Sequence, residues 1–156
     1  MPAIYENLKL ESLRVGERIA FLRKLNGITQ EELGNAIGLV GSDARNKIWR
    51  YEHTERVPKD DKILKLADAL GIEIAAIRHY DFSDPLDIYY LLLWTEEISP
   101  NYVINKVESI RPENNTQRLL GDRYTEWHRM RLRYKKGDIS LQEYRKWKFD
   151  KRGESR

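Results

Sequence analysis

The chain has 156 residues and no cysteine, and its 28 Lys and Arg against 25 Asp and Glu give a formal charge of +3. Without cysteine, neither a disulfide framework nor thiolate zinc ligation is available. No apolar run approaches the roughly 18 residues that span a bilayer, and the N-terminus lacks a secretory pattern. We therefore expect a cytoplasmic protein, built as one domain with a sizeable appendage or as two small domains.

Two helices are predicted at the start of the chain. Apolar residues recur at helical spacing over Val15–Leu25, and an Asn-Gly pair that ends at Gly27 stops this first helix. Thr29 is a candidate N-cap of the second helix. Glu32, three residues on, is its capping-box partner, and Gly38 is the stop.

A third helix is predicted over Ser42 to His53, with Ser42 as its N-cap. Ala44, Ile48 and Tyr51 fall at i, i+4 and i+7 and form an inward side. At about 100° per residue, the opposite side is polar and basic and carries Asp43, Asn46, Trp49, Arg50 and His53, flanked by Arg45 and Lys47. Bulk charge says little here, because residues 1–80 hold 13 Lys and Arg against 12 Asp and Glu. The local arrangement carries the prediction, because a helix that presents donors outward fits the major groove of B-DNA.

Two more helices are predicted before residue 80. Pro58 marks the start of a fourth helix, and Gly71 closes it. Its core stripe comprises Ile63, Leu66, Ala67 and Leu70. A short fifth helix over Ile74 to Tyr80 would complete a five-helix bundle.

Four linked stretches resemble the Cro/C1-type helix-turn-helix family, also called XRE or phage-repressor-like regulators. They are GERIAFLRKLNGITQEEL at 16–33, RYE at 50–52, ERVP at 55–58 and ILKLADALGIEIAAI at 63–77. The resemblance implies a lambda-repressor-like DNA-binding domain in residues 1–80. The chain departs from the family pattern in a longer loop after Gly38 and in Thr54, where a glycine is common.

The resemblance also implies which residues read bases, at the start of the third helix and one turn later. Arg45, Asn46 and Arg50 are the candidates, since arginine can donate twice to guanine and asparagine can bond adenine at two positions. Trp49 lies on the same side. It could pack against a thymine methyl group, lean on the loop at 39–41 or meet another protein.

Three basic residues are candidates for phosphate contacts: Lys47, Arg56 and Lys59. Gln30 matches a family position whose side chain touches a phosphate or steadies the recognition helix, and its backbone N–H lies at a helix N-terminus. Glu52 would repel DNA if it faced it. The resemblance implies instead a structural ion pair between Glu52 and Arg23.

Residues 81–156 are predicted to be mostly helical. A sixth helix begins with Asp84 as N-cap and Pro85 at its first position, and its apolar run Leu91–Trp94 must be covered by this chain or by a second copy. The segment 102–107 alternates weakly, which is compatible with a short strand. A further helix is predicted over 117–135, and a turn at 136–138 follows it. The last helix is predicted over 140–148, and Ser140 and Glu143 form a capping box at its start.

Charge is divided unevenly within this second half. Residues 81–122 hold 3 Lys and Arg against 8 Asp and Glu, whereas residues 123–152 hold 11 against 4, so the two segments can pair. The expected core is aromatic: Tyr89, Tyr90, Trp94, Trp127, Tyr144 and Trp147. A ligand cage or a dimer interface is the alternative for these rings. The stretch from Trp127 to Trp147, with KKGDISLQEYRKW, resembles appendages of some regulators of Gram-positive bacteria and their mobile elements.

The sequence as a whole predicts an all-α, sequence-specific DNA-binding transcriptional regulator, with repression as the expected output. A homodimer on a pseudo-palindromic double-stranded operator is expected, because one small head covers few base pairs. The alternative is an antitoxin or another protein-interaction module whose C-terminal region binds a partner. His53, His79 and His128 are scattered, and no nucleotide-binding or nucleophile motif occurs, so no enzyme activity, metal, cofactor or small-molecule ligand is predicted.

Overall fold

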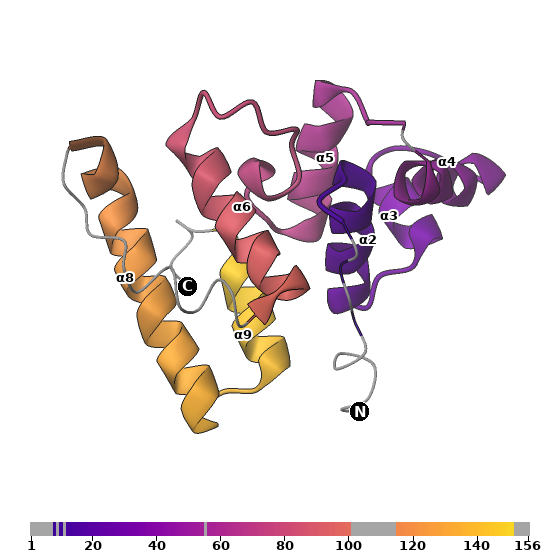
Figure 1. Ribbon diagram of the computed structural model, residues 1–156. Helices are drawn as coiled ribbons and strands as arrows, with labels where there is room; N and C mark the ends of the chain where they lie inside the picture. Colours follow the sequence, from indigo (N-terminus) through magenta and orange to yellow (C-terminus); the bar gives the residue numbers. More distant parts are fainter. Residues whose placement is uncertain (1–7, 9, 11, 55, 101–114, 152–156) are drawn as a thin grey trace. The chain divides into compact units, whose positions relative to one another are not determined.

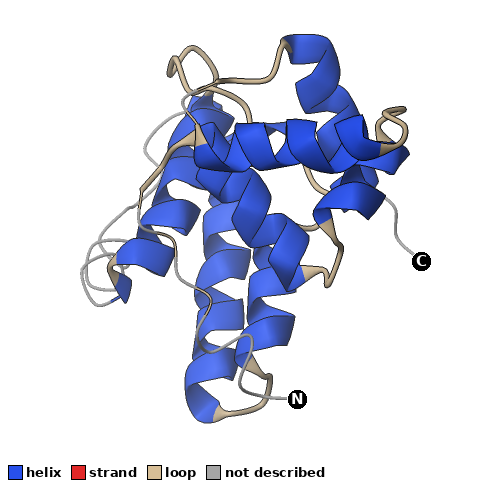
Figure 2. Cartoon of the chain, turned by 90° about the vertical axis from the view of Figure 1, so that its right-hand side faces the viewer, coloured by secondary structure: helices blue, strands red, loops and turns tan. Residues whose placement is uncertain are grey.

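The computed structural model describes residues 8, 10, 12–54, 56–100 and 115–151 (Figure 1). Its fold is all-α, and every named element within those ranges is helical (Figure 2). The chain divides into two compact units. Unit 1 holds the residues up to His79 together with those from Phe149 onward, and unit 2 holds Tyr80–Lys148. None of the described helices combines the length and apolar character that a membrane span requires.

The first two helices have the predicted positions. Helix α2 spans Val15–Leu25 and α3 spans Gln30–Ala36. The predicted capping box is confirmed, because the Thr29 N–H donates to Glu32 Oε2 at 2.7 Å and the Glu32 N–H donates to Thr29 Oγ1 at 3.1 Å. Two of the first free N–H groups of the helix are thereby satisfied.

Helix α4 spans Ser42–His53, as predicted, but the predicted cap was wrong. The N-cap is Gly41, which makes no side-chain hydrogen bond, and Ser42 is the first helical residue. Gly41 has φ 63° and ψ −146°, a conformation that suits glycine, so the chain enters the helix one residue earlier than a serine cap would allow. The predicted inward side is confirmed, because Ala44 and Ile48 are fully buried and Tyr51 is buried as well.

Helix α5 spans Asp60–Leu70 and starts two residues later than predicted, because Pro58 and the N-cap Lys59 still belong to the preceding segment. Its predicted stop is confirmed. Gly71 takes the left-handed conformation, with φ 66°, that commonly ends helices. The predicted core stripe of α5 is buried along its whole length.

The predicted fifth helix to Tyr80 was wrong, because only the 3₁₀ turn η1, Ile74–Ala76, forms there. The guanidinium of Arg18 donates to the carbonyls of Ala76, at 3.0 Å, and Arg78, at 2.9 Å. These contacts hold the segment that follows η1 against α2. The described residues of unit 1 therefore form four α-helices and one 3₁₀ turn where five helices were expected.

Two helical glycines let α4 approach its neighbours at backbone distance. A Cβ at Gly16 of α2 would lie 1.8 Å from the carbonyl oxygen of Tyr51. A Cβ at Gly34 of α3 would lie 2.5 Å from the carbonyl oxygen of Ala44. Any larger residue at either position would force α4 away from the helix it packs on.

Unit 1 is completed by residues from the end of the described chain. The Phe149 ring meets the Phe21 ring edge-on, with 6.3 Å between centroids and 72° between planes. The Lys151 N–H donates to the Gly71 carbonyl at 3.0 Å. The sequence analysis placed one boundary after residue 80. It did not predict that the residues from Phe149 onward belong to unit 1.

Unit 2 is built from α6, Pro85–Ile98, α8, Asn115–Lys136, and α9, Leu141–Phe149, whose last residue groups with unit 1. The predicted cap of α6 is confirmed, since Asp84 accepts from the Leu86 N–H at 2.9 Å. The capping box before α9 is confirmed too, because the Glu143 N–H donates to Ser140 Oγ at 3.2 Å and Glu143 accepts from the Ser140 N–H at 2.7 Å. The segment 102–107, read as a possible strand, lies outside the described residues.

The predicted aromatic core of unit 2 is confirmed for five of its six members. Tyr89, Tyr90, Trp94, Trp127 and Tyr144 are buried, and Trp147 is half-buried. Within the apolar run of α6, Leu93 and Trp94 have no exposed surface in a single chain. These two side chains therefore need no second copy to cover them.

Candidate nucleic-acid interface

The outer side of α4 is solvent-exposed, as the sequence predicted. Its exposed side chains are Ser42, Asp43, Arg45, Asn46, Lys47, Trp49, Arg50 and His53, so one carboxylate lies among the cations. On a helix that advances about 100° per residue, Asn46 lies at the middle of this face and Arg45 and Lys47 lie at its edges. The face thus carries an amide at its centre and cations on both sides.

An ion pair holds α4 against α2. Arg23 Nε lies 2.6 Å from Glu52 Oε1, and Arg23 Nη2 donates to Glu52 Oε2 at 3.0 Å. The Arg23 side chain is 11% exposed and that of Glu52 is 2% exposed. The predicted Arg23–Glu52 pair is confirmed, and its two-pronged geometry fixes the rotation of α4 as well as its position.

Gln30 joins the same carboxylate. Its Nε2 donates to Glu52 Oε2 at 2.8 Å, so the side chain connects the start of α3 to α4. Of the two roles implied for Gln30 by the family resemblance, this contact supports the one that steadies the recognition helix. The backbone N–H of Gln30, at the N-terminus of α3, would still be available for a phosphate contact.

A hollow of about 330 Å³ lies along one edge of the α4 face, and we call it the α4 hollow. Its lining comprises Leu39, Asp43, Asn46, Lys47, Arg50, Tyr51 and Arg56. Two predicted base-reading residues, Asn46 and Arg50, are thus brought together with two predicted phosphate contacts, Lys47 and Arg56. Burial raises the pKa of the Tyr51 hydroxyl at the base of the hollow, so this group stays protonated.

Arg45 lies on the other edge of the face. It lines a second hollow, of about 870 Å³, together with Gln30, His53 and two basic residues that the sequence analysis did not single out, Arg14 and Lys24. Arg14 is paired with Glu17 at 2.6 Å, which leaves Lys24 as the stronger added candidate for a phosphate contact. The sequence did not predict a role for Lys24. Lys24 lies on α2 and Gln30 on α3, and the two helices come together only in the folded unit. Lys59 lines neither of these two hollows.

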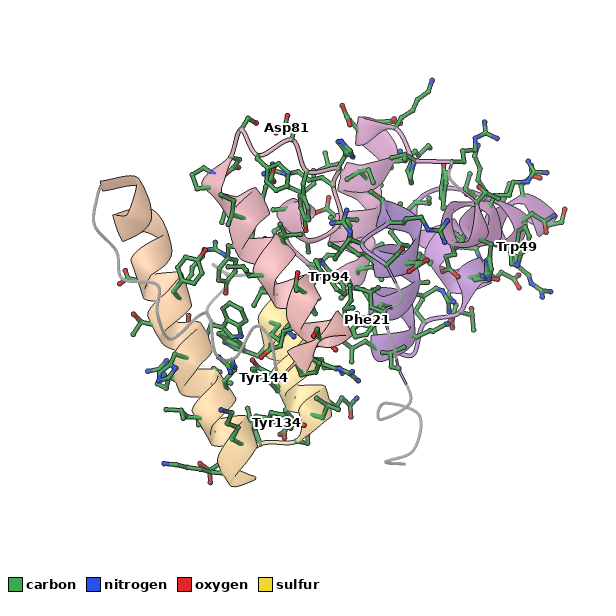
Figure 3. All side chains as sticks on the ribbon, viewed as in Figure 1. Phe21, Trp49, Asp81, Trp94, Tyr134 and Tyr144 are labelled. Carbon is green, nitrogen blue, oxygen red and sulfur yellow. The ribbon has the colours of Figure 1, made fainter. Side chains whose placement is uncertain are left out.

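Trp49 stacks on His53 one helical turn later. The ring centroids are 4.7 Å apart and the planes differ by 13°, and His53 Nδ1 lies 3.0 Å from the Trp49 carbonyl oxygen. Trp49 remains 48% exposed and projects from the outer side of α4 (Figure 3). The sequence analysis considered a loop, a thymine and a partner protein for Trp49 but not this stack, although the spacing of four residues allows it.

The chemistry of the face is that of a binding surface. It offers guanidinium, ammonium and amide donors, and Asp43 is the one carboxylate that lines the α4 hollow among the described residues. Within the described ranges, no group of three or more His, Asp or Glu side chains could hold a metal ion. Comparisons of the chain with protein-family models, with curated proteins and with solved structures found no match, so the Cro/C1-type resemblance stays a prediction.

Proposed function

We propose that the chain is a sequence-specific DNA-binding transcriptional regulator of the Cro/C1-type helix-turn-helix kind, with α4 as its recognition helix. The observation that supports this most is the two-sided character of α4. Its inner side is buried on α2 and α3, while Asn46 and Arg50 share the α4 hollow with Lys47 and Arg56. A single helix with such a face fits the major groove of B-DNA, where base edges can be read.

The contacts divide into two kinds under this proposal. Asn46 and Arg50 contact base edges, adenine and guanine respectively, and each good two-pronged pair contributes about 1–3 kcal/mol of discrimination. Lys47 and Arg56 contact phosphates and position the helix without reading sequence. Arg45, at the opposite edge, can reach a base or the other strand's backbone.

Anchoring of α4 supports specificity. A base-reading side chain discriminates only when its helix cannot rotate or slide, because a misplaced donor satisfies several bases equally well. The Arg23–Glu52 pair and the Gln30 hydrogen bond restrain that rotation, and the glycine contacts at Gly16 and Gly34 set the distance.

A single head of this size covers few base pairs, so we propose that two copies bind a pseudo-palindromic operator with half-sites roughly one DNA turn apart. Occupancy of an operator that overlaps a promoter would exclude polymerase, which makes repression the proposed output. The proposal places the chain in the cytoplasm, together with the DNA.

The test is selection of binding sites from a random pool of duplex DNA, followed by mobility shifts on the selected and on scrambled duplexes. Asn46→Ala and Arg50→Ala should lose affinity for the selected site and little for scrambled DNA. Lys47→Ala should weaken both equally and reduce the salt slope by about one. Matched controls are Lys65→Ala on the exposed side of α5 and Arg129→Ala, whose side chain is 71% exposed in unit 2.

Two results would contradict the proposal at different levels. If no duplex is enriched from the pool, the DNA-binding function is wrong, and a protein-interaction module such as an antitoxin becomes the better reading. If duplexes are enriched but all three α4 variants lose the same factor on every sequence, DNA binding stands and the base-reading assignment fails.

A further inference from the structure

Unit 2 contains a cluster of buried charges. Among the described residues it joins α6, α8 and α9 and consists of two carboxylates and three cations: Glu96, Glu97, Arg131, Arg145 and Lys148. Every one of these side chains is at most 8% exposed. A buried cation is costly unless it is paired and its donors are satisfied, so the hydrogen bonds of each cation matter.

The two carboxylates are already engaged by other partners. Lys148 Nζ lies 3.0 Å from Glu96 Oε2 and also bonds Glu97 Oε1. Arg145 Nε donates to Glu97 Oε2 at 2.9 Å. The Tyr144 hydroxyl donates to Glu96 at 3.0 Å. Burial, and then the nearby Glu96, raises the pKa of Tyr144, so its hydroxyl stays neutral and adds no negative charge.

The guanidinium of Arg131 is paired with Glu96, but its donors are not satisfied by hydrogen bonds. Its Nε lies 2.9 Å from Glu96 Oε1, but the N–H is not directed at that oxygen. None of its three nitrogens makes a hydrogen bond with any described residue, although the side chain is 3% exposed. Its guanidinium carbon lies 5.8 Å from the centroid of the Trp127 ring, which stabilises the charge but satisfies no donor. The Nη1 and Nη2 donors form a fork that matches a two-oxygen anion.

A hollow of about 180 Å³ adjoins this guanidinium, and we call it the unit 2 hollow. Besides the charged cluster, apolar surface lines it: Pro100, Tyr134, Leu141 and Tyr144. The Tyr134 and Tyr144 rings lie parallel, 5.2 Å apart, and are labelled near the joined ends of α8 and α9 in Figure 3.

We propose that the unit 2 hollow binds a small carboxylate with an apolar body, whose two oxygens accept from the Arg131 fork. The flat guanidinium fork matches the two oxygens of a carboxylate. The apolar lining fits a short branched or aromatic body, and Lys135 at the rim adds a further positive charge. The Nη atoms are covered from solvent, so binding requires a side chain that lines the hollow to move.

The first test is isothermal titration of the full chain with benzoate and with isovalerate, beside benzamide and inorganic phosphate. At least one carboxylate should bind with a Kd of about 1 mM or tighter. Benzamide, which has the shape of benzoate without its charge, should bind at least about tenfold more weakly, and so should phosphate. Absence of binding by both carboxylates, or equal binding of benzamide or phosphate, would overturn the proposal.

Variants then locate the site. Arg131→Lys keeps the charge and removes the fork, and it should weaken benzoate by about tenfold or more. The matched control is Arg133→Lys, an exposed arginine on the same helix that does not line the hollow. Leu141→Phe should fill the hollow and abolish benzoate binding, while the helical circular dichroism stays unchanged. If Arg131→Lys does not fold, this second variant tests the location of the site. Unchanged affinity in Leu141→Phe would place the ligand elsewhere. The titration measures binding directly, so it does not depend on the proposed DNA-binding function.

Discussion

Gly34 of α3 faces the backbone of Ala44 in α4 so closely that a Cβ at position 34 would lie 2.7 Å from the Ala44 Cα and 2.5 Å from its carbonyl oxygen. Neither atom can move without moving α4. A glycine inside a helix costs about 0.5–1 kcal/mol relative to alanine, so its presence here has to be offset by packing. The contact sets how far the proposed recognition helix stands from α3.

Gly34→Ala should therefore destabilise the protein even though alanine is the better helix former. We expect a loss of about 1–3 kcal/mol in the free energy of unfolding, from urea titration followed by circular dichroism, because overpacking outweighs helix propensity. Asn35→Ala, at the exposed neighbouring position, should stay within about 0.5 kcal/mol of the parent chain. A stabilised Gly34→Ala protein would show that α3 and α4 are not packed this closely.

The Arg23–Glu52 pair should show strong coupling in a double-mutant cycle. Arg23→Met alone leaves the nearly buried Glu52 carboxylate with Gln30 as its remaining hydrogen-bond donor among the described contacts, and should cost about 3–5 kcal/mol. The double replacement Arg23→Met with Glu52→Leu should cost clearly less than the sum of the two single losses. Additive losses would mean that the pair contributes little.

Acid should weaken unit 2 through Glu97. Burial by itself raises the pKa of this carboxyl, but Lys148 and Arg145 outweigh burial and hold the pKa below its ordinary value of 4.5. A folded-state pKa below the unfolded one means that the stabilisation is present above about pH 4.5 and is lost as the pH falls through the folded value. Unfolding free energies measured from pH 7 downward should drop below about pH 4.5, and Glu97→Gln should flatten that drop.

The control for this experiment is Glu31→Gln, which removes an exposed carboxylate in the first turn of α3. Its stability should follow the pH dependence of the parent chain. An equal slope for Glu97→Gln and the parent would show that the buried cluster does not supply the acid sensitivity.

The fluorescence of Trp49 can be used to follow what covers the α4 face. Trp94 and Trp127 have no exposed surface, whereas Trp49 is 48% exposed on the outer side of α4. Acrylamide should quench Trp49 most and the half-buried Trp147 less, and a bound operator duplex should protect Trp49. Trp49→Phe should remove most of the DNA-dependent change in fluorescence. Protection that persists in Trp49→Phe would mean that DNA covers a different surface.

Local patterns predicted the helices of this chain well because each depends on neighbours in sequence. The bounds of α2 and α4 and the capping box of Thr29 and Glu32 follow from apolar spacing and from a hydrogen bond that spans three residues. The cap of α4 was missed because Gly41 and Ser42 are both good candidates, and the sign of φ, which decides between them, is not readable from the residue types.

Features that depend on distant contacts were not predictable in detail. Arg18 is buried and donates to two carbonyls about sixty residues away, at the place where only η1 forms instead of the expected fifth helix. The uneven charges of residues 81–152 indicated that acidic and basic segments pair, and the Glu96 and Glu97 contacts confirm it. The unsatisfied donors of Arg131 could not be predicted from composition, because they depend on the orientation of its guanidinium in the folded unit.

Phe149 and Lys151 complete unit 1 from the far end of the described chain. During synthesis on a ribosome, α2 to α5 emerge long before the ring that covers one side of Phe21. The unit that begins first is thus finished only after the whole of unit 2 has been made, and a nascent chain without its last helix carries an incomplete unit 1.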